Sequence, residues 1–331
     1  MSNKVSAVIF TRAGGPEVIE LGTVAVRAPG AEEVTVEIAA AGVNRADVLQ
    51  RRGHYPAPAG APADVPGLEF AGTVVACGAN AQRFSCGAAV MGIVAGGAMA
   101  QRVTLHEREL MRVPAGLSLQ AAAAIPEAFL TAWDAMRQAR LGPGHVLLVH
   151  AAASGVGTAA LQLARWMQVR ALATTRTQAK LTALAAFGLQ PDDGIVVGAQ
   201  GGFAPIVKQR VARGVDMVLD CVGGNYLADN VAALAPQGTM VMLGAMGGAT
   251  GALPIGQVLA KRVRIVGSVM RARGLEEKIA LAQAFEQLVV PAFASGALAP
   301  VVHTVMPMSE CAAAHTLLES NTTIGKVVLT W

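Results

Sequence analysis

The chain has 331 residues, of which 53% are hydrophobic and 15% charged, so it is too apolar for a disordered protein and long enough for about two domains. Its 26 lysines and arginines face 22 aspartates and glutamates, without a dense basic block, which argues against nucleic acid as the main partner. The longest uncharged segment, 230–260, contains Pro236 and Pro254, and the N-terminus has no cleavable apolar segment, so we expect no membrane partner and a cytoplasmic protein.

The first third of the sequence is predicted to be rich in β-strands. Short β-branched runs separated by glycine, proline and asparagine predict strands over 5–10, 33–40, 72–76 and 98–105. Four prolines between positions 55 and 66 exclude a regular element there, because proline lacks the amide hydrogen that helices and sheets use. We therefore expect a compact, irregular β-barrel in this part of the chain.

From residue 145 onward, apolar strands alternate with helices. Strands that are apolar along most of their length, with helices between them, are typical of a parallel sheet covered on both faces. Six such strands indicate the doubly wound dinucleotide-binding fold, and so an α/β protein. These six predicted strands are 145–150, 170–175, 194–197, 215–221, 238–244 and 263–268, and the main helices among them are 155–167 and 177–187. A further predicted helix, 275–293, leads into two more strands, 301–305 and 326–330.

The turn at residues 150–157, His-Ala-Ala-Ala-Ser-Gly-Val-Gly, carries the strongest functional signal. The dinucleotide fingerprint G-x-G-x-x-G needs small residues, so that backbone N–H groups and a helix N-terminus can approach a pyrophosphate. Ala152 and Ser154 stand in place of the first two glycines, and Gly157 keeps the third. Between a buried strand and a helix, this turn predicts a nucleotide site; the alternative is a purely structural tight turn.

The end of the second strand of this series predicts which cofactor is used. NAD-specific sites usually place Asp or Glu there to bind the ribose 2′-hydroxyl. Here the strand runs into Thr174-Thr175-Arg176-Thr177, followed by Lys180 and no acid. Two cations that can meet a 2′-phosphate favour NADPH, whereas the alternative is that both are ordinary surface charges.

Taken together, these and other motifs resemble one family along essentially the whole chain. The chain is similar to zinc-free medium-chain dehydrogenase/reductases of the quinone oxidoreductase branch, nearest the tumour-suppressor-inducible NADPH:quinone reductases and more distantly zeta-crystallin. The resemblance implies a chaperonin-10-like catalytic domain over 1–122 and 271–331, interrupted by a Rossmann NADPH-binding domain over 123–270, with the active site between them. The matching stretches are 14–17, 41–47, 67–72, 124–132, 150–157, 220–226, 244–248 and 321–329.

Zinc is not expected, although alcohol dehydrogenases that share the family fold contain it. By the resemblance, their zinc ligands fall at Asn44, Leu68 and Glu127, which cannot supply the thiolates and imidazole of a catalytic zinc site. The four cysteines form no C-x-x-C pair, and we expect reduced thiols. Without a Lewis acid the acceptor must itself be electrophilic, as a quinone or another conjugated carbonyl is.

The resemblance also implies a set of cofactor contacts. Asn44 would face the nicotinamide ribose and Thr131 the nicotinamide, with Asn321 and Lys326 approaching from the C-terminal segment. The other implied contacts are Ser154, Gly155, Val156 and Gly157 for the pyrophosphate, Arg176, Thr177 and Lys180 for the 2′-phosphate, Cys221 and Val222 for the adenosine, and Leu243, Gly244, Ala245, Met246, Ser268, Val269 and Met270 for the nicotinamide. The chain departs from some relatives in having Val197, Leu49 and Asn321 where they carry Tyr, Tyr and Arg.

Tyr55 and Asn44 are the candidate catalytic residues. Tyr55 is suited to stack on or hydrogen-bond a quinone, and the alternative is that it packs an exposed loop. Asn44 is expected to orient cofactor or acceptor. Asp47 is expected to orient the Asn44 loop, and Glu127 to fix the segment between the domains. His150 is expected to be structural, satisfied by backbone contacts.

The preferred function is NADPH-dependent reduction of a quinone without a metal. The alternatives are an NADPH-dependent 2-enoyl thioester or alkenal reductase and, in another class, an NADPH-binding regulatory or structural protein with little turnover. The strand 263–268 is expected to be an exposed edge of the Rossmann sheet, which predicts a homodimer formed through it.

Overall fold

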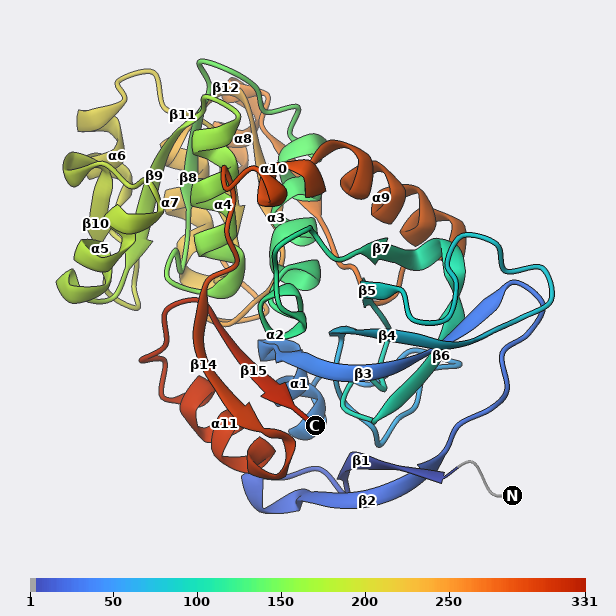
Figure 1. The fold of residues 1–331 in the computed structure, drawn as a ribbon. Helices are drawn as coiled ribbons and strands as arrows, with labels where there is room; N and C mark the ends of the chain where they lie inside the picture. Colours follow the sequence, from blue (N-terminus) through green and yellow to red (C-terminus); the bar gives the residue numbers. More distant parts are fainter. Residues whose placement is uncertain (1–3) are drawn as a thin grey trace. The chain divides into compact units, whose positions relative to one another are not determined.

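The computed structural model describes residues 4–331, which divide into two compact units (Figure 1). The first unit consists of the chain up to Leu130 together with Met270–Trp331, and the second consists of Thr131–Val269. The second unit is therefore inserted into the sequence of the first. One boundary falls inside a single helix, α3 (Pro126–Gln138).

The first unit is built on two β-sheets. β1 and β2 form an antiparallel pair, and a larger sheet has the order β14-β15-β3-β4-β5-β7, with β6 beside β3. The C-terminal strand β15 pairs antiparallel with β3, so the end of the chain completes this sheet. The strands are β1 (Lys4–Phe10), β2 (Ile19–Ala25), β3 (Glu33–Val43), β4 (Glu69–Cys77), β5 (Ala89–Ile93), β6 (Arg102–His106), β7 (Leu110–Arg112), β14 (Val302–Pro307) and β15 (Lys326–Thr330).

Side chains of this sheet form the core of the first unit. Val34, Val36 and Ile38 of β3 are buried with Phe70 and Val74 of β4. The sequence predicted β1, β3, β4, β6, β14 and β15, but it missed β2, β5 and β7. The missed strands are short or contain glycine, so their apolar pattern is too brief to be distinguished from a loop.

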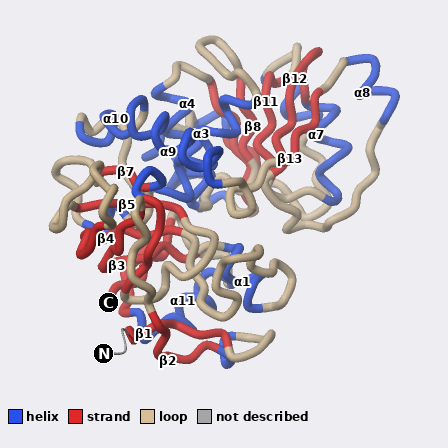
Figure 2. Tube along the Cα trace, turned by 90° about the vertical axis from the view of Figure 1, so that its right-hand side faces the viewer, coloured by secondary structure: helices blue, strands red, loops and turns tan. Residues whose placement is uncertain are grey.

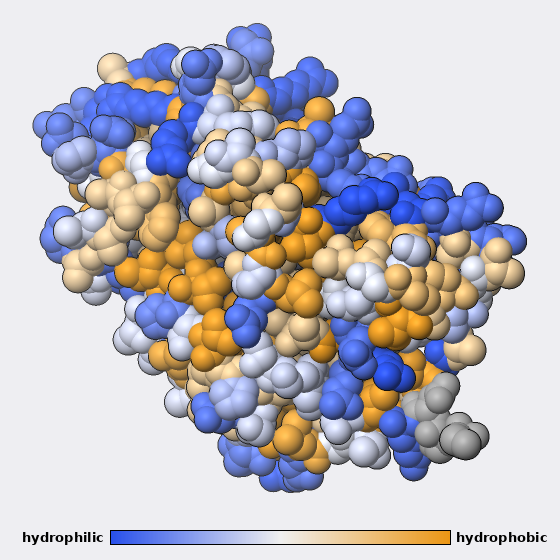
Figure 3. Space-filling model, viewed as in Figure 1, coloured by the Kyte–Doolittle hydropathy of each residue, from blue (hydrophilic) through white to orange (hydrophobic). Residues whose placement is uncertain are grey.

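The helices of the first unit flank its sheet. They are α1 (Arg45–Arg51), α2 (Leu119–Ala122), α9 (Leu275–Leu288), α10 (Val290–Ala294) and α11 (Cys311–Glu319), with the start of α3. The predicted single helix over 275–293 is divided at Val289. A new helix begins at Val290, and Pro291 in its first turn lacks the amide hydrogen that would continue the earlier helix. α9 buries Ile279 and Phe285 and presents hydrophilic side chains on its outer face (Figure 3).

The second unit contains the predicted parallel sheet, which confirms the fold class. Its strand order is β10-β9-β8-β11-β12-β13, the order of a doubly wound dinucleotide-binding fold, and the strands run side by side with helices beside them (Figure 2). The strands are β8 (Val146–Val149), β9 (Arg170–Thr175), β10 (Gly194–Val196), β11 (Val215–Asp220), β12 (Leu234–Met242) and β13 (Arg264–Gly267), and the helices are the rest of α3, α4 (Gly155–Trp166), α5 (Gln178–Leu184), α6 (Ala204–Arg210), α7 (Leu227–Ala233) and α8 (Ile255–Lys261).

Two boundaries in this unit differ from the prediction by more than two residues. The fifth strand begins at Leu234 rather than at residue 238, because the pairing of β11 with β12 continues across Pro236 through a register shift. The helix predicted to reach residue 187 ends at Leu184 and is followed by a 3-10 turn that stops at Gly188, whose φ of +99° favours glycine. Among residues 4–331, none of the helices combines the length and apolar character needed to cross a bilayer.

Candidate functional site

The glycine-containing turn joins β8 to α4 and is built for close backbone approach. The Ser154 hydroxyl accepts a hydrogen bond from the Gly157 amide at 3.1 Å and so caps α4. A Cβ at Gly157 would lie 2.5 Å from the Ala152 carbonyl oxygen, so only glycine fits. The free N–H groups of the first helical turn therefore open toward the space beyond the strand end, where a phosphate can bind.

The end of β9 presents the two predicted cations. Arg176 is exposed, and Thr177 caps the short helix α5, its hydroxyl accepting from the Lys180 amide at 3.4 Å. The Thr175 hydroxyl donates to the Thr177 carbonyl at 2.8 Å, which fixes the turn around Arg176. Val197, where some relatives carry a tyrosine, is buried in the core of the second unit.

Backbone hydrogen bonds join the loop after β11 to the loop after β12. The Cys221 carbonyl accepts from the Met246 amide at 3.3 Å, and the Val222 carbonyl accepts from the Gly247 amide at 2.7 Å. The Ser268 amide donates to the Met242 carbonyl at 2.9 Å, which brings the residues after β13 to the same edge. The structure thus gathers 154–157, 176–180, 221–222, 243–246 and 268–269 at the carboxyl ends of neighbouring parallel strands, where open α/β sheets bind ligands.

His150 differs from its expectation. It is structural, but side chains rather than backbone groups satisfy its imidazole: Nδ1 lies 2.8 Å from Thr174 Oγ1 and Nε2 lies 2.7 Å from Asn230 Oδ1. Asn230 in turn donates to Asp220 Oδ2 at 2.9 Å. The sequence held no signal for this network, because its members are up to 80 positions apart.

In the first unit, Asn44 is held from several sides. Its backbone amide donates to Asp47 at 2.7 Å, and its side chain completes the reciprocal capping box of α1. Its Nδ2 donates to Glu69 Oε1 at 3.0 Å, and its Oδ1 accepts from Lys326 Nζ at 2.5 Å. Asp47 also accepts from the Gly67 amide at 3.0 Å, so its expected role in orienting the Asn44 loop matches this geometry.

Lys326 lies inside the first unit. Its ammonium group donates to the Val43 carbonyl at 2.9 Å, to Asn44, and to Glu69 Oε1 at 2.5 Å. An ammonium has three N–H donors, and here all three are used within the unit. Asn321, the other implied C-terminal contact, accepts from Arg45 Nη2 at 2.7 Å. Both residues therefore serve the local structure of this unit.

Glu127 is a buried acid with an unusual environment. Burial and the neighbouring Glu69 carboxylate raise its pKa from 4.5 to about 8, so the carboxyl is protonated at neutral pH. Its amide donates to Glu69 Oε2 at 2.8 Å. Within residues 4–331 no hydrogen-bond partner reaches Glu127 Oε2, nor the buried Thr131 Oγ1 one helical turn further along α3. Unpaired buried polar atoms of this kind often mark a water or ligand position.

Tyr55 is half-buried and is held by an arginine that the sequence analysis did not single out. The Arg271 guanidinium carbon lies 5.3 Å from the centre of the Tyr55 ring, and Nη1 donates to the Tyr55 carbonyl at 3.2 Å. Arg271 also donates to the Ala95 carbonyl and to Gln50 Oε1, each at 2.6 Å. Burial raises the pKa of the Tyr55 phenol. No local pattern distinguishes Arg271 from the other arginines, because its partners are distant in sequence.

The residues at the positions implied for zinc do not fit that metal. Asn44 and Glu127 are two of these positions, and the cationic Nζ of Lys326 already lies 2.5 Å from the Asn44 oxygen, where it would repel a second cation. Leu68 offers no ligand atom. Across the described part of the chain, no group of three or more His, Cys, Asp or Glu side chains is arranged to hold a metal ion.

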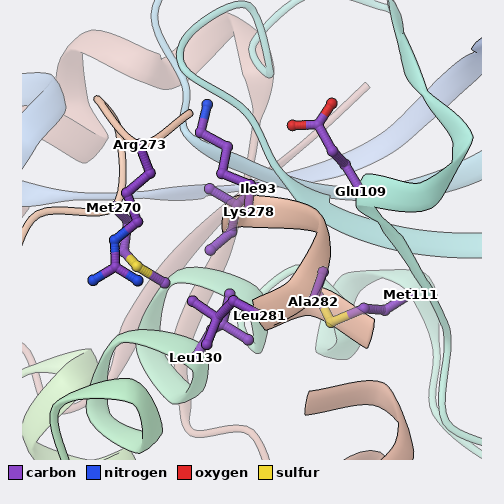
Figure 4. A pocket seen from close by; sticks show the side chains of 9 residues that line it. All are labelled: Ile93, Glu109, Met111, Leu130, Met270, Arg273, Lys278, Leu281 and Ala282. Carbon is purple, nitrogen blue, oxygen red and sulfur yellow. The ribbon is translucent and has the colours of Figure 1, made fainter. Parts of the chain in front are cut away.

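The first unit also encloses a small cavity (Figure 4). Leu130, Leu281 and Met270 lie around it, with Lys278 and Glu109 at its rim, and burial raises the pKa of the Glu109 carboxyl. Its volume of about 20 Å³ suits one water molecule, so it is too small for an organic substrate.

The sequence is similar to two family models and to known proteins. A model described as "Zinc-binding dehydrogenase" matches residues 193–329, and one described as "Alcohol dehydrogenase GroES-like domain" matches residues 30–115. The chain is 33% identical to quinone oxidoreductase-like protein 2 of Mus musculus over 247 residues, which cover 74% of this chain and 69% of that protein.

Two solved structures are similar over nearly their full lengths. A Pseudomonas syringae quinone oxidoreductase has a TM-score of 0.88 and 27% identity, covering 99% of this chain and 100% of that one. The CurK enoyl reductase has a TM-score of 0.86 and 27% identity, covering 99% of each chain.

Proposed function

Because the chain belongs to the medium-chain dehydrogenase/reductase family of oxidoreductases, whose members bind a nicotinamide cofactor, we propose that it transfers electrons from NADPH to a quinone. The observation that carries the proposal is the carboxyl edge of the parallel sheet in the second unit. There a helix N-terminus with room only for glycine at position 157 stands beside the exposed Arg176. This arrangement suits a dinucleotide with an additional phosphate.

The residues at this edge fit NADPH. In the proposed complex the amides of Gly155 and Val156, with the Ser154 hydroxyl, hold the pyrophosphate, and Gly157 leaves room for its close approach. Arg176, Thr177 and Lys180 hold the 2′-phosphate, because no carboxylate stands at the end of β9 to bind an unphosphorylated ribose. The adenosine and nicotinamide sides are completed by Cys221, Val222, Leu243, Gly244, Ala245, Met246, Ser268, Val269 and Met270. Asn44 is assigned to the nicotinamide ribose and Thr131 to the nicotinamide.

The first unit supplies residues that orient the acceptor. When bound, the dihydronicotinamide supplies the two electrons and the hydrogen that a quinone requires. Tyr55 offers an aromatic ring whose orientation is fixed by Arg271, and it can stack on a quinone or hydrogen-bond it. Asn44 has both amide atoms engaged, so its role is to orient rather than to move protons. A reduced quinone can take its protons from water, so no protein acid is obligatory.

The direct test follows NADPH oxidation with 9,10-phenanthrenequinone, 1,4-benzoquinone and crotonyl-CoA in parallel. We expect turnover with the quinones. The double variant Arg176→Ala/Lys180→Ala should lower the preference for NADPH over NADH by roughly tenfold or more, since two charge-assisted contacts are lost. Lys208→Ala, on α6 away from the strand ends, is the matched control. An unchanged preference in the double variant would remove the NADPH assignment.

A second candidate is reduction of a 2-enoyl thioester or alkenal. The likeness to the CurK enoyl reductase, nearly as close as that to the quinone oxidoreductase, favours it. Turnover with crotonyl-CoA but not with either quinone would assign the protein to this reaction. If NADPH binds but is not oxidised with any of the three acceptors, the result would instead support a regulatory or structural protein.

We further propose a homodimer that pairs through β13. This strand borders the sheet, and β12 is its partner within the described chain. Exposed apolar side chains lie near it, including Leu259 at 71%, Ile255 at 64% and Val269 at 51% exposure. Apolar edge strands invite pairing with another chain. Light scattering should give twice the chain mass, and Ile265→Lys should shift the protein toward monomer; a monomeric wild type would refute the dimer.

A further inference from the structure

The imidazole of His150 lies at the centre of a network of hydrogen-bonded side chains that is buried in the second unit. Only 1% of the residue is exposed. Its two ring nitrogens contact Thr174 at 2.8 Å and Asn230 at 2.7 Å, and Asn230 continues to Asp220 at 2.9 Å. The rings of Phe203 and Tyr226 pack against it at centroid distances of 4.7 and 5.0 Å.

The direction of each hydrogen bond follows from the last member. A carboxylate only accepts, so Asn230 donates Nδ2–H to Asp220 and turns its oxygen toward His150. His150 must then donate Nε2–H to that oxygen. Burial lowers the pKa of His150 and keeps the ring neutral, so its Nδ1 accepts the hydroxyl hydrogen of Thr174. With this single tautomer of His150, each hydrogen bond of the network has one donor and one acceptor.

Three of the four members of this network stand at or near the strand ends that lead into loops assigned to the cofactor, and the fourth, Asn230 of α7, joins two of them. His150 precedes the turn that leads to α4, and Thr174 precedes Arg176 on the neighbouring strand. Asp220 ends β11, and its Oδ1 accepts the amides of Val222 at 2.8 Å and Gly223 at 3.0 Å. The network therefore connects the carboxyl ends of β9, β8 and β11, which are adjacent in the sheet.

Backbone contacts reinforce the same three ends. The His150 amide donates to the Leu219 carbonyl at 3.1 Å, and the Ala152 amide donates to the Thr174 carbonyl at 3.1 Å. Backbone bonds fix the strands in register, and a few of them, such as that of Ala152, continue into the loops. The side-chain network adds a second set of contacts that helps to hold the first residues of the loops at a set spacing.

We propose that His150 is a positioning residue for the cofactor, which sets the spacing between the pyrophosphate loop, the 2′-phosphate loop and the adenosine loop. It does not touch the cofactor and acts through its two neighbours. The Thr174 contact controls the Arg176 loop and so the preference for NADPH over NADH. The Asn230 contact controls the Val222 loop, which both cofactors share. This inference rests on the proposed function, since it assigns those loops to a dinucleotide.

Three substitutions separate the two contacts. His150→Asn can still accept from Thr174 but cannot reach Asn230, whereas His150→Gln can reach Asn230 but not Thr174. His150→Phe keeps the aromatic packing with Phe203 and Tyr226 and removes both hydrogen bonds. Kd values for NADPH and NADH are measured on the full chain by the fluorescence of the reduced nicotinamide.

We expect distinct signatures for the three variants. His150→Phe should weaken binding of both cofactors by roughly tenfold or more, because two buried polar groups lose their partner. His150→Asn should weaken both to a similar extent and keep the ratio of the two Kd values. His150→Gln should lower the preference for NADPH by a factor of several, because the Arg176 loop is released.

A matched control separates positioning from loss of stability. Val149→Ala removes buried volume from the same strand, one residue earlier, without touching the network. It should lower Tm and leave both Kd values unchanged. If His150→Asn and His150→Gln bind with unchanged Kd values and ratio, or if Val149→Ala changes the Kd values as much, the inference is wrong. A wild type that binds neither cofactor would overturn the proposed function itself, which is a different outcome.

Discussion

The two units bury polar groups in opposite ways. In the first unit, full charges are buried in contact with one another, as in Lys326 with Glu69, and Arg271 lies near Asp47. In the described part of the second unit, no lysine or arginine is buried, and the buried polar chain runs through neutral His150 and Asn230 to a single carboxylate. Removing one hydrogen bond from a neutral network lowers the free energy of unfolding only modestly, whereas removing one member of a buried ion pair leaves an uncompensated charge.

The largest expected effect is therefore in the first unit. Lys326→Met should destabilise the protein by about 3–5 kcal/mol, because the buried Glu69 side chain would lose the ammonium group that contacts it. Urea unfolding measures this loss. The double variant Lys326→Met/Glu69→Gln should regain part of the stability, and Lys278→Met, a partly exposed lysine on α9, should cost much less. Equal losses for Lys326→Met and Lys278→Met would contradict the contrast between the units.

The second prediction concerns pH. The pKa of Glu127 is about 8 in the folded state and 4.5 ordinarily, so the folded protein holds a proton that the unfolded chain releases between these values. Stability should accordingly fall as pH rises from about 5 to about 8, by an amount on the order of a few kcal/mol. Glu127→Gln should flatten this dependence, as followed by unfolding at several pH values. A wild type whose stability rises across this window would show that Glu127 is ionised when folded.

A smaller effect is expected at Tyr55, and it concerns activity. Tyr55→Ala should lower kcat/KM for a quinone by roughly tenfold, since an aromatic contact is worth about 0.5–1.5 kcal/mol. Tyr55→Phe distinguishes stacking from hydrogen bonding, because it keeps the ring and removes the hydroxyl. If both variants keep full kcat/KM, Tyr55 serves only to pack against Arg271.

The smallest effect is expected at the helix cap of the second unit. Ser154→Ala removes the acceptor for the Gly157 amide and should cost about 1 kcal/mol of stability. Ser154→Gly should cost only a few tenths, since glycine tolerates the cap conformation. Thermal unfolding of the two variants measures the difference; a larger loss for Ser154→Gly would show that the hydroxyl is not the cap.

The sequence predicted the second unit better than the first. In the second unit the strand 170–175 was placed with the bounds observed, and Ser154, Gly157 and Arg176 lie at or just beyond strand ends as expected. These features are local, because a strand, a turn and a helix follow one another within about 30 residues. Short strands such as β7 left too little pattern to detect.

The buried charges of the first unit could not be predicted in this way. Lys326 and Asn44 are 282 positions apart, and Arg271 and Gln50 are 221 apart. Sequence patterns predict that a charged residue lies at the surface unless its partner is known, because isolated charges are almost never buried. The role of Lys326 as an internal cation, and the raised pKa of Glu127 beside Glu69, depend on that long-range assembly.

The pairing of β15 with β3 has a consequence for biosynthesis. The strand that borders β3 comes from the last residues of the chain, whereas all of the second unit precedes them. On the ribosome the inserted unit can therefore fold while its host still lacks a strand, and the edge of β3 stays open until β15 has been synthesised. Such an open edge is a site for chaperone binding, and a chain truncated before β15 would present it permanently.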